Sequence, residues 1–362
     1  MTTVDAVVVG AGPIGIEVHA ALRAAGASVR HIEAGAIGHT MTWWAPKTTF
    51  FSSPERISVC GIPLAVPGQA KATGDDYVEY LVGVVRQLGL PIETFRRVTD
   101  IRKADRGFDV AIARSSEGVG GQASINDRQA AEPVETIATT NVILCSGNMH
   151  GPRMVEIPGE GLPHVSHYLA DPLRYVARKV LIVGGKNSAV EAAIRLHRAG
   201  ASVTVAHRQP DFDDARVKPW LLPELRWLID KGRIRYEPSA VPVSIDADRS
   251  TFERDGTAFE IGADDVLLLT GYVQDQSLFD RLGLERLGDE HRPRFDRETM
   301  QTSVPGVYVA GTACGGSQRR ARVFIENSHV HADRICRAIT GKGVPWALDP
   351  EFSKLGSADE ER

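Results

Sequence analysis

Short apolar runs, each followed by a glycine-rich turn and an amphipathic stretch, open the chain. Residues 4–9 (VDAVVV) are typical of a strand that is buried on both faces. The turn after them leads into an Ala/Leu-rich stretch that predicts a helix to about residue 25. Gly26 ends this helix, and residues 28–33 predict the next strand. The order strand, turn, helix, strand predicts a parallel βαβ unit.

The same pattern returns in the middle of the chain. Residues 179–183 predict a buried strand, a Gly-rich turn follows, and a helix is expected to run to residue 199 before Gly200 and a strand at 202–207. Further elements are predicted as an amphipathic helix at 75–88 and strands near 98–112, 136–144, 266–270 and 307–310. The polar stretches 115–132 and 351–362 predict a mobile loop and a frayed end.

The repeat of this unit predicts two nucleotide-binding domains. Residues 151–163 are rich in glycine and proline, which is typical of a crossing between domains. We therefore expect an α/β fold with two Rossmann-like domains of three layers (ββα). Residues 1–157 and 273–362 are expected to form one domain, and residues 158–272 a second domain inserted into it.

The first turn matches a dinucleotide-binding motif in the right context. It consists of Gly10, Ala11, Gly12, Pro13, Ile14 and Gly15. Gly10 permits the tight turn, Gly12 lets backbone approach a pyrophosphate at the helix N-terminus, and Gly15 allows close packing of helix and strand. Glu33, at the end of the next strand, is positioned to accept hydrogen bonds from ribose hydroxyls. The alternative is a glycine-rich turn without a ligand.

The second turn departs from this motif. Lys186 and Ala189 replace its middle and last glycines, and His207 with Arg208 stands where an acid would favour a free ribose hydroxyl. This basic pair favours a 2′-phosphate, so we expect NADPH rather than NADH. The predicted NADPH contacts are Gly184, Lys186, Asn187, Ser188, His207, Arg208 and Gly271. The alternatives are a solvated Lys186 and an exposed arginine at a strand end.

Two turns with different ribose signatures predict two cofactors. The simplest arrangement has FAD at the acid-bearing turn and NADPH at the basic one, with hydride passing from the nicotinamide to the flavin.

Composition narrows the class of protein further. The chain has 362 residues, 43% of them hydrophobic, and a formal net charge of -4, so nothing indicates binding to nucleic acid or to an anionic membrane. No apolar run has the length of a membrane span. The four cysteines form no CxxC pair, which argues against a metal site and a dithiol mechanism and predicts a cytoplasmic enzyme.

Three further segments resemble the two-dinucleotide-binding-domain flavoproteins, the group that includes thioredoxin reductase. They are residues 142–147 (VILCSG), 268–272 (LLTGY) and 299–311 (TMQTSVPGVYVAG). Most members carry an acid directly after the last glycine of the third segment, where this chain has Thr312.

Within this group the chain resembles the YpdA-type bacillithiol disulfide reductases over nearly its whole length. The similar strings are TFFSS at 49–53, GGKNSA at 184–189, KPW at 218–220 and FIEN at 324–327. The resemblance implies an NADPH-dependent FAD enzyme, homo-oligomeric, that acts on the disulfide of a small thiol. These reductases typically carry a cysteine where this chain has Ile14, so their mixed-disulfide mechanism does not carry over.

The resemblance also implies where the flavin is bound. The expected FAD contacts, besides the first turn and Glu33, are Lys47, Thr49, Val98, Gly147, Gly311, Thr312, Phe324 and Ile325. Residues 322–339 are expected to form a helix whose N-terminus faces the flavin, with His329 and His331 at a surface or interface. Candidates that line the active cavity are Thr49, Phe51, Ser52 and Cys60; the alternatives are a core-packing loop and, for Cys60, a small buried hydrophobe.

These observations favour an NADPH-dependent FAD oxidoreductase that passes hydride to a small acceptor such as a low-molecular-weight disulfide. One alternative is a flavin-dependent monooxygenase. Another is a flavoprotein that senses NADPH without efficient turnover.

Overall fold

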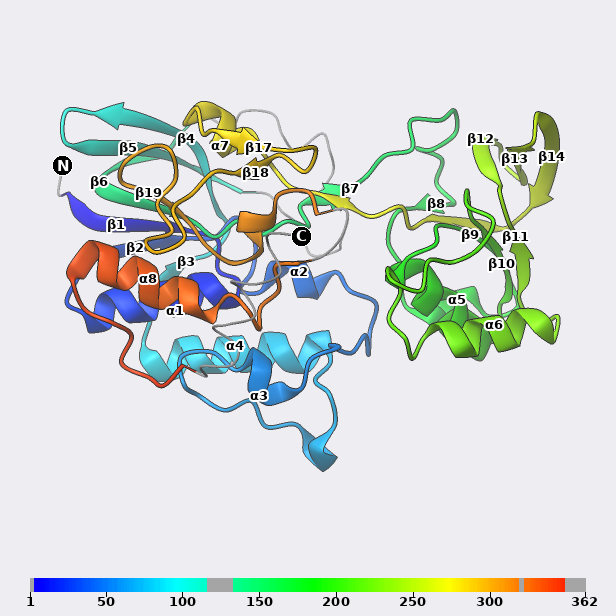
Figure 1. Ribbon diagram of the computed structural model, residues 1–362, viewed down its shortest axis with the longest axis horizontal. Helices are drawn as coiled ribbons and strands as arrows, with labels where there is room; N and C mark the ends of the chain where they lie inside the picture. The colour runs from blue at the N-terminus through cyan, green and yellow to red at the C-terminus, as the bar shows by residue number, and fades with distance from the viewer. Residues whose placement is uncertain (1–2, 116–132, 319–321, 349–362) are drawn as a thin grey trace. The chain divides into compact units, whose positions relative to one another are not determined.

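The computed structural model describes residues 3–115, 133–318 and 322–348. The predicted loop after Ser115 and the predicted frayed end at 351–362 lie outside these residues. The chain divides into two compact units (Figure 1). Unit 1 comprises residues 1–43, 47–151 and 272–362, and unit 2 comprises residues 44–46 and 152–271.

The core of unit 1 is a seven-stranded sheet in the order β3-β2-β1-β6-β5-β4, with β19 also paired to β6. Its strands are β1 (Val4–Val9), β2 (Val29–Ile32), β3 (Ile92–Glu93), β4 (Arg96–Ala104), β5 (Gly107–Arg114), β6 (Glu135–Leu144) and β19 (Val307–Val309). Strand β6 pairs with two strands along one edge. Its first half pairs antiparallel with β5, and its second half pairs parallel with β19. The C-terminal part of the chain thereby joins the N-terminal βαβ unit.

Helices α1 (Pro13–Ala24) and α8 (His329–Thr340) lie side by side beneath this sheet, with α4 (Gly74–Leu88) below them (Figure 1). Helix α1 begins at Pro13, whose fixed φ suits a first helical position. Helix α4 begins at a capping box between Thr73 and Asp76. Short helical segments complete unit 1: α2 (His39–Thr42), α3 (Pro54–Ile57), η1 (Pro67–Gln69), α7 (Ser277–Arg281) and η4 (Gly311–Gly315).

Unit 2 repeats the same architecture around a five-stranded parallel sheet in the order β11-β10-β9-β15-β8. Its strands and helices are β8 (Val165–Ser166), η3 (Pro172–Tyr175), β9 (Lys179–Val183), α5 (Asn187–Ala199), β10 (Ser202–Ala206), α6 (Leu222–Asp230), β11 (Arg235–Glu237) and β15 (Asp265–Leu268). Helix α5 ends at Gly200, which adopts φ +94°.

A three-stranded antiparallel sheet, which the sequence pattern did not reveal, forms a further layer of unit 2. It comprises β12 (Val241–Ile245), β13 (Arg249–Arg254) and β14 (Thr257–Gly262). Phe252 and Ile261 are buried on its inner face in one apolar cluster with residues of β9 and β15. The remaining strands form two short pairs, β7 (Gly151–Pro152) with β16 (Tyr272–Val273) and β17 (Arg286–Leu287) with β18 (Arg292–Pro293).

The predicted α/β class with two Rossmann-like units is confirmed by these two sheets and their covering helices. Among the described residues, no helix combines the length and the apolar character that a membrane span requires.

Candidate cofactor and substrate sites

The three glycines of the first turn have different surroundings. A Cβ on Gly10, which has φ +104°, would lie 2.5 Å from the carbonyl oxygen of Cys145, and a Cβ on Gly15 would lie 2.0 Å from that of Gly10. Both glycines are therefore required for packing. A Cβ on Gly12 would meet nothing within 4 Å, and no side chain caps the helix that begins there. This open helix N-terminus fits the pyrophosphate of a dinucleotide.

The Glu33 carboxylate lies at this turn, as the sequence predicted. Its two oxygens accept hydrogen bonds from the backbone amides of Ala11 at 2.6 Å and Gly35 at 2.7 Å. Burial raises the pKa of Glu33, and these amide hydrogen bonds partly offset that effect. Each carboxylate oxygen keeps a second lone pair, so the group can accept a further hydrogen bond from a ribose hydroxyl.

Two buried histidines support the turn, and neither was predicted from the sequence. The Nε2 atom of His31 lies 3.0 Å from the carbonyl oxygen of Gly10, and its Nδ1 atom lies 3.1 Å from Nδ1 of His19. A carbonyl only accepts, so Nε2 of His31 carries the proton and His19 donates to the free Nδ1 of His31. Burial lowers the pKa of His31 to about 4. Burial, and then the nearby His31, lower the pKa of His19 to about 3.

The predicted C-terminal contacts lie against the same turn. A Cβ on Gly311 would lie 3.3 Å from Cβ of Ile14, and a Cβ on Gly147 would lie 3.8 Å from Oγ1 of Thr312. Ile14 is buried. The amide of Gly311 donates to Nδ1 of His331 at 3.1 Å. The structure therefore brings together segments that are far apart in the sequence.

His331 corrects one expectation. It was expected at a surface or interface, yet it is buried, and this burial lowers its pKa to about 3. Its ring lies against Gly311, whose amide donates to its Nδ1 atom.

The predicted residues of the 47–52 loop differ in their environment. Lys47 and Thr49 are exposed, and Thr49 forms an isolated bridge with Thr73. Phe51 is half-buried and accepts a hydrogen bond from Lys71 through its carbonyl oxygen. Ser52 donates from Oγ to Glu326 at 2.5 Å. Val98, on β4, belongs to the apolar core of unit 1.

The segment around Phe324 and Ile325 is not helical, contrary to the expected helix over 322–339. Its backbone amides donate to side chains and not to helical carbonyl groups. The side chain of Gln318 accepts from the amides of Arg322 and Val323, and the side chain of Asn327 accepts from the amide of Phe324. Helix α8 begins only at residue 329. The backbone of 322–325 is thus held by local side-chain hydrogen bonds.

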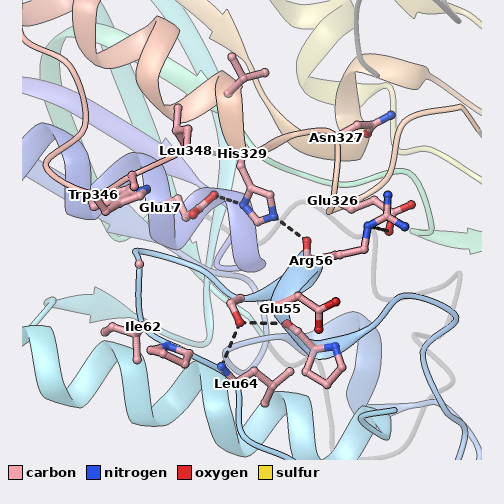
Figure 2. A pocket seen from close by; sticks show the side chains of 16 residues that line it. Glu17, Glu55, Arg56, Ile62, Leu64, Glu326, Asn327, His329, Trp346 and Leu348 are labelled. Carbon is pink, nitrogen blue, oxygen red and sulfur yellow. Dashed lines mark hydrogen bonds and ion pairs between the residues drawn. The ribbon is translucent and has the colours of Figure 1, made fainter. Parts of the chain in front are cut away.

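A cavity of about 390 Å³ lies in unit 1 beside this segment (Figure 2). Glu17 of α1 and His329 of α8 face each other in its wall, with 2.8 Å between Oε2 and Nδ1. Nε2 of His329 lies 3.0 Å from the carbonyl oxygen of Arg56. Since both ring nitrogens face acceptors, both are satisfied only in the imidazolium form. Burial disfavours that charge, but Glu17 outweighs burial and raises the pKa of His329. The surface position expected for His329 was therefore wrong.

Three of the four cysteines have an environment that disfavours a nucleophilic thiolate. All four are buried, and none forms a disulfide with another. Burial, with a contribution from Glu17, strongly raises the pKa of Cys60, and its backbone amide donates to Glu17 at 3.0 Å. Burial raises the pKa of Cys145 to about 12 and also raises that of Cys336. The thiolate form that attacks a disulfide is thus disfavoured at these three residues.

In unit 2, the turn between β9 and α5 is closely packed. A Cβ on Gly184 would lie 2.5 Å from the carbonyl oxygen of Leu269 and 3.0 Å from Cβ of Ala189. The imidazole of His207 lies directly over the turn: a Cβ on Gly185 would lie 2.2 Å from its Nε2 atom. Nδ1 of His207 is buried and has no hydrogen-bond partner among the described residues.

The other predicted residues of unit 2 surround this turn. Lys186, Ser188 and Arg208 are exposed. Asn187 accepts from the amide of Lys218 at 2.8 Å and so anchors the loop after β10. Gly271 adopts φ +105° at the boundary of the unit. Burial and then Arg208 lower the pKa of His207. The fit to an anionic nucleotide therefore rests on exposed cations and an uncapped helix N-terminus.

The family model described as pyridine nucleotide-disulphide oxidoreductase matches residues 7–116 and 130–311. The chain belongs to this family. The match spans the turn of unit 1, that of unit 2 and the strand before Gly311. Like other pyridine nucleotide-disulphide oxidoreductases, this chain is an oxidoreductase that uses a flavin and a pyridine nucleotide, which confirms the predicted enzyme class.

Known proteins are similar to this chain over nearly its whole length. Bacilliredoxin reductase Bdr of Bacillus subtilis (strain 168) is 29% identical over 335 residues, which are 92% of this chain and 97% of the relative. The structure of bacillithiol disulfide reductase Bdr (YpdA) from Bacillus cereus superposes with a TM-score of 0.85 at 28% identity, covering 94% of this chain and 99% of that one. Thioredoxin reductase of T. acidophilum has the same fold, with a TM-score of 0.69 at 20% identity, covering 94% and 99% of the two chains.

Proposed function

We propose that unit 1 binds FAD, that unit 2 binds NADPH, and that the protein reduces a small disulfide with electrons from NADPH. The observation that carries this proposal is a difference between the two strand–turn–helix units. The strand that follows the helix leads to the buried carboxylate of Glu33 in unit 1, and to His207 and Arg208 in unit 2. When bound, the flavin supplies hydride transfer between the nicotinamide and the acceptor. The reaction balances as NADPH, a proton and a disulfide giving NADP⁺ and two thiols.

In unit 1, the open helix N-terminus at Gly12 supports a role in holding the pyrophosphate of FAD. Glu33 would accept from the adenosine ribose, and its bonds to Ala11 and Gly35 hold it at the turn. The backbone of Phe324 and Ile325, fixed by Asn327, would contact the flavin ring.

In unit 2, charge favours NADPH over NADH. Arg208 is exposed directly after β10, and Lys186 is exposed at the start of α5. Both can contact the 2′-phosphate or the pyrophosphate of NADPH. The Nδ1 atom of His207, which has no hydrogen-bond partner in the part of the chain that the structure describes, offers a further polar contact at this position.

The reduction of the acceptor is proposed to proceed without a protein thiol. Ile14 stands where the related reductases typically carry a cysteine, and it is buried against Gly311. Cys60, the other candidate, has a raised pKa. Hydride would therefore pass to the disulfide directly. The four cysteines form no disulfide with one another, which also supports a reducing, cytoplasmic location.

The experiment that tests the cofactors compares two glycine variants. Gly12→Ala should fold normally, because its Cβ meets no protein atom within 4 Å, yet it should lose most bound FAD because that Cβ occupies the place of the pyrophosphate. Gly83→Ala, in α4 and equally open, is the matched control and should keep its FAD. The measurement is the flavin absorbance per protein after purification. Equal FAD in both variants would contradict the proposed site.

The acceptor is tested by stopped-flow mixing. The purified protein is reduced with NADPH or NADH and then mixed with disulfides or with air. Faster reduction by NADPH and rapid reoxidation by a disulfide support the proposal. Slow reoxidation by every disulfide, with oxygen as the faster oxidant, would favour a monooxygenase instead.

A further inference from the structure

Three aspartates follow the arginine that is proposed to contact the 2′-phosphate of NADPH. Asp211, Asp213 and Asp214 lie in the loop that joins β10 to α6, a few residues after Arg208, and all three are exposed. A carboxylate close to this position repels a 2′-phosphate and favours the free ribose hydroxyl of NADH. The loop thus carries charges that oppose the preference for NADPH unless a cation offsets them.

Aromatic stacking holds this loop against the residue that follows β10. The ring of Phe212 stacks on His207 with 5.5 Å between the ring centroids, and it lies 4.9 Å from the ring of Tyr236 on β11. Phe212 is buried in the apolar core of unit 2. Burial lowers the pKa of His207, Arg208 lowers it further, and Asp211 raises it. The charges of Arg208 and Asp211 therefore lie close to the same ring, at the proposed position of the 2′-phosphate.

Helix α6 supplies a cation that two of these carboxylates share. Nη1 and Nη2 of Arg226 donate to the two oxygens of Asp214 at 2.9 Å and 3.2 Å, and Nη2 also lies 3.3 Å from Oδ2 of Asp211. The two-point contact raises the pKa of Arg226 and lowers that of Asp214. The third carboxylate has a partner within the loop, because Nε of Arg216 lies 2.9 Å from Oδ2 of Asp213.

We propose that Arg226 is a positioning residue that determines the preference for NADPH, because it holds Asp211 and Asp214 and offsets their charge beside Arg208. The proposal rests on the proposed function, since it requires the 2′-phosphate to bind at Arg208. With Arg226 present, two arginines face two aspartates; without it, the carboxylates outnumber Arg208. Arg226 need not contact the nucleotide, because charges at a protein surface act over several ångströms.

The test compares two nucleotides that differ only in the 2′-phosphate. Isothermal titration calorimetry of the flavin-loaded protein measures the binding of 2′,5′-ADP and of 5′-AMP, neither of which can transfer hydride. The parent protein should bind 2′,5′-ADP more tightly. Arg226→Gln should lower the ratio of the two affinities about fivefold at low ionic strength, as expected for removing one cation several ångströms from a doubly charged phosphate. The affinity for 5′-AMP should not change.

The salt dependence is a second measurement. Because the charges are exposed, salt screens their interaction with the phosphate, and the effect of Arg226→Gln should shrink to about twofold at an ionic strength of about 0.15 M. The hydride step provides a third. In stopped-flow reduction of the flavin, Arg226→Gln should raise the concentration of NADPH that gives half the maximal rate, whereas the maximal rate and both values for NADH should stay as in the parent protein.

Further variants separate a charge effect from a change in loop structure. Asp211→Asn with Asp214→Asn should restore at least the parent ratio when added to Arg226→Gln, and should raise the ratio above the parent value when Arg226 is kept. A purely structural role of Arg226 predicts instead that its loss weakens the binding of both nucleotides and that the asparagines do not restore it.

Arg198→Gln is the matched control. Arg198 forms a comparable exposed ion pair with Glu224 of α6, at 2.6 Å and 2.9 Å from its two carboxylate oxygens. It lies at the end of α5 opposite to the glycine-rich turn. Its substitution should therefore leave the affinity ratio as it is. The flavin spectrum of each variant verifies that the cofactor is retained.

The outcomes separate this proposal from the proposed function. If the parent protein binds 2′,5′-ADP no more tightly than 5′-AMP, the proposed NADPH site fails, and the role of Arg226 fails with it. If the parent prefers 2′,5′-ADP but Arg226→Gln keeps the parent ratio, or the asparagines do not restore a lowered ratio, the role of Arg226 is overturned while the proposed function stands.

Discussion

The His19–His31 pair makes the stability of unit 1 depend on pH in a predictable direction. Both histidines are neutral in the folded state, with pKa values of about 3 and about 4, against 6.5 for an unfolded histidine. Below pH 6.5 the unfolded chain therefore binds more protons than the folded one, and stability falls as the pH falls toward 4. The perturbation that tests this is His31→Gln, because a glutamine amide can still donate to the carbonyl of Gly10 but does not titrate.

The magnitude follows from the pKa values. Consider a histidine that is neutral in the folded protein and charged in the unfolded chain. Each unit by which the pH falls in this range lowers the free energy of unfolding by about 1.4 kcal/mol. Between pH 6.5 and about pH 4.5 the pair then costs on the order of 5 kcal/mol, and removing His31 should abolish at least half of this. More than half is expected because His31 also lowers the pKa of His19.

The assay is urea unfolding followed by circular dichroism at several pH values in this window. His31→Gln should show a shallower fall in the free energy of unfolding than the parent protein. His291→Asn is the control: His291 is exposed with φ 52°, which asparagine tolerates, so this change should leave the slope as it is. A parent slope that persists in His31→Gln would refute the reasoning about the pair.

Three further changes test other parts of the molecule. Arg208→Glu should reverse the preference of NADPH over NADH by at least about tenfold in KM, because the new carboxylate repels a 2′-phosphate; an unchanged ratio would contradict the role of this residue. Glu17→Gln should destabilise the protein by about 3 kcal/mol at neutral pH, since it leaves the His329 charge without its partner. Because the pKa of His329 is raised in the folded protein, its charge contributes fully to stability below pH 6.5. This contribution disappears as the pH rises through the folded pKa. The destabilisation caused by Glu17→Gln should therefore be smaller at alkaline pH, as measured by unfolding titrations. Ile14→Cys should add a thiol that traps disulfides, measured as a mixed disulfide by mass spectrometry; failure to trap any would show that this position does not meet the acceptor.

The local pattern of the chain was sufficient to predict the two βαβ units. Strands β1 and β9 have the predicted bounds, and α1 and α5 end next to the expected glycines. These features follow from short-range physics: apolar runs favour buried strands, and glycine adopts the left-handed conformation that ends a helix. The two glycine-rich turns, together with the resemblance to two-dinucleotide-binding-domain flavoproteins, also predicted the enzyme class.

Other features depend on contacts between distant residues, which no local pattern encodes. Glu17 meets His329 across 312 positions, and Ser52 meets Glu326 across 274. The start of α8 was predicted too early because hydrogen bonds from side chains outside the helix compete for its backbone amides. Whether a histidine is exposed, neutral in a core or charged in a cavity wall depends on which helix covers it. Packing between distant segments decides this, and so the cavity emerged only from the folded chain.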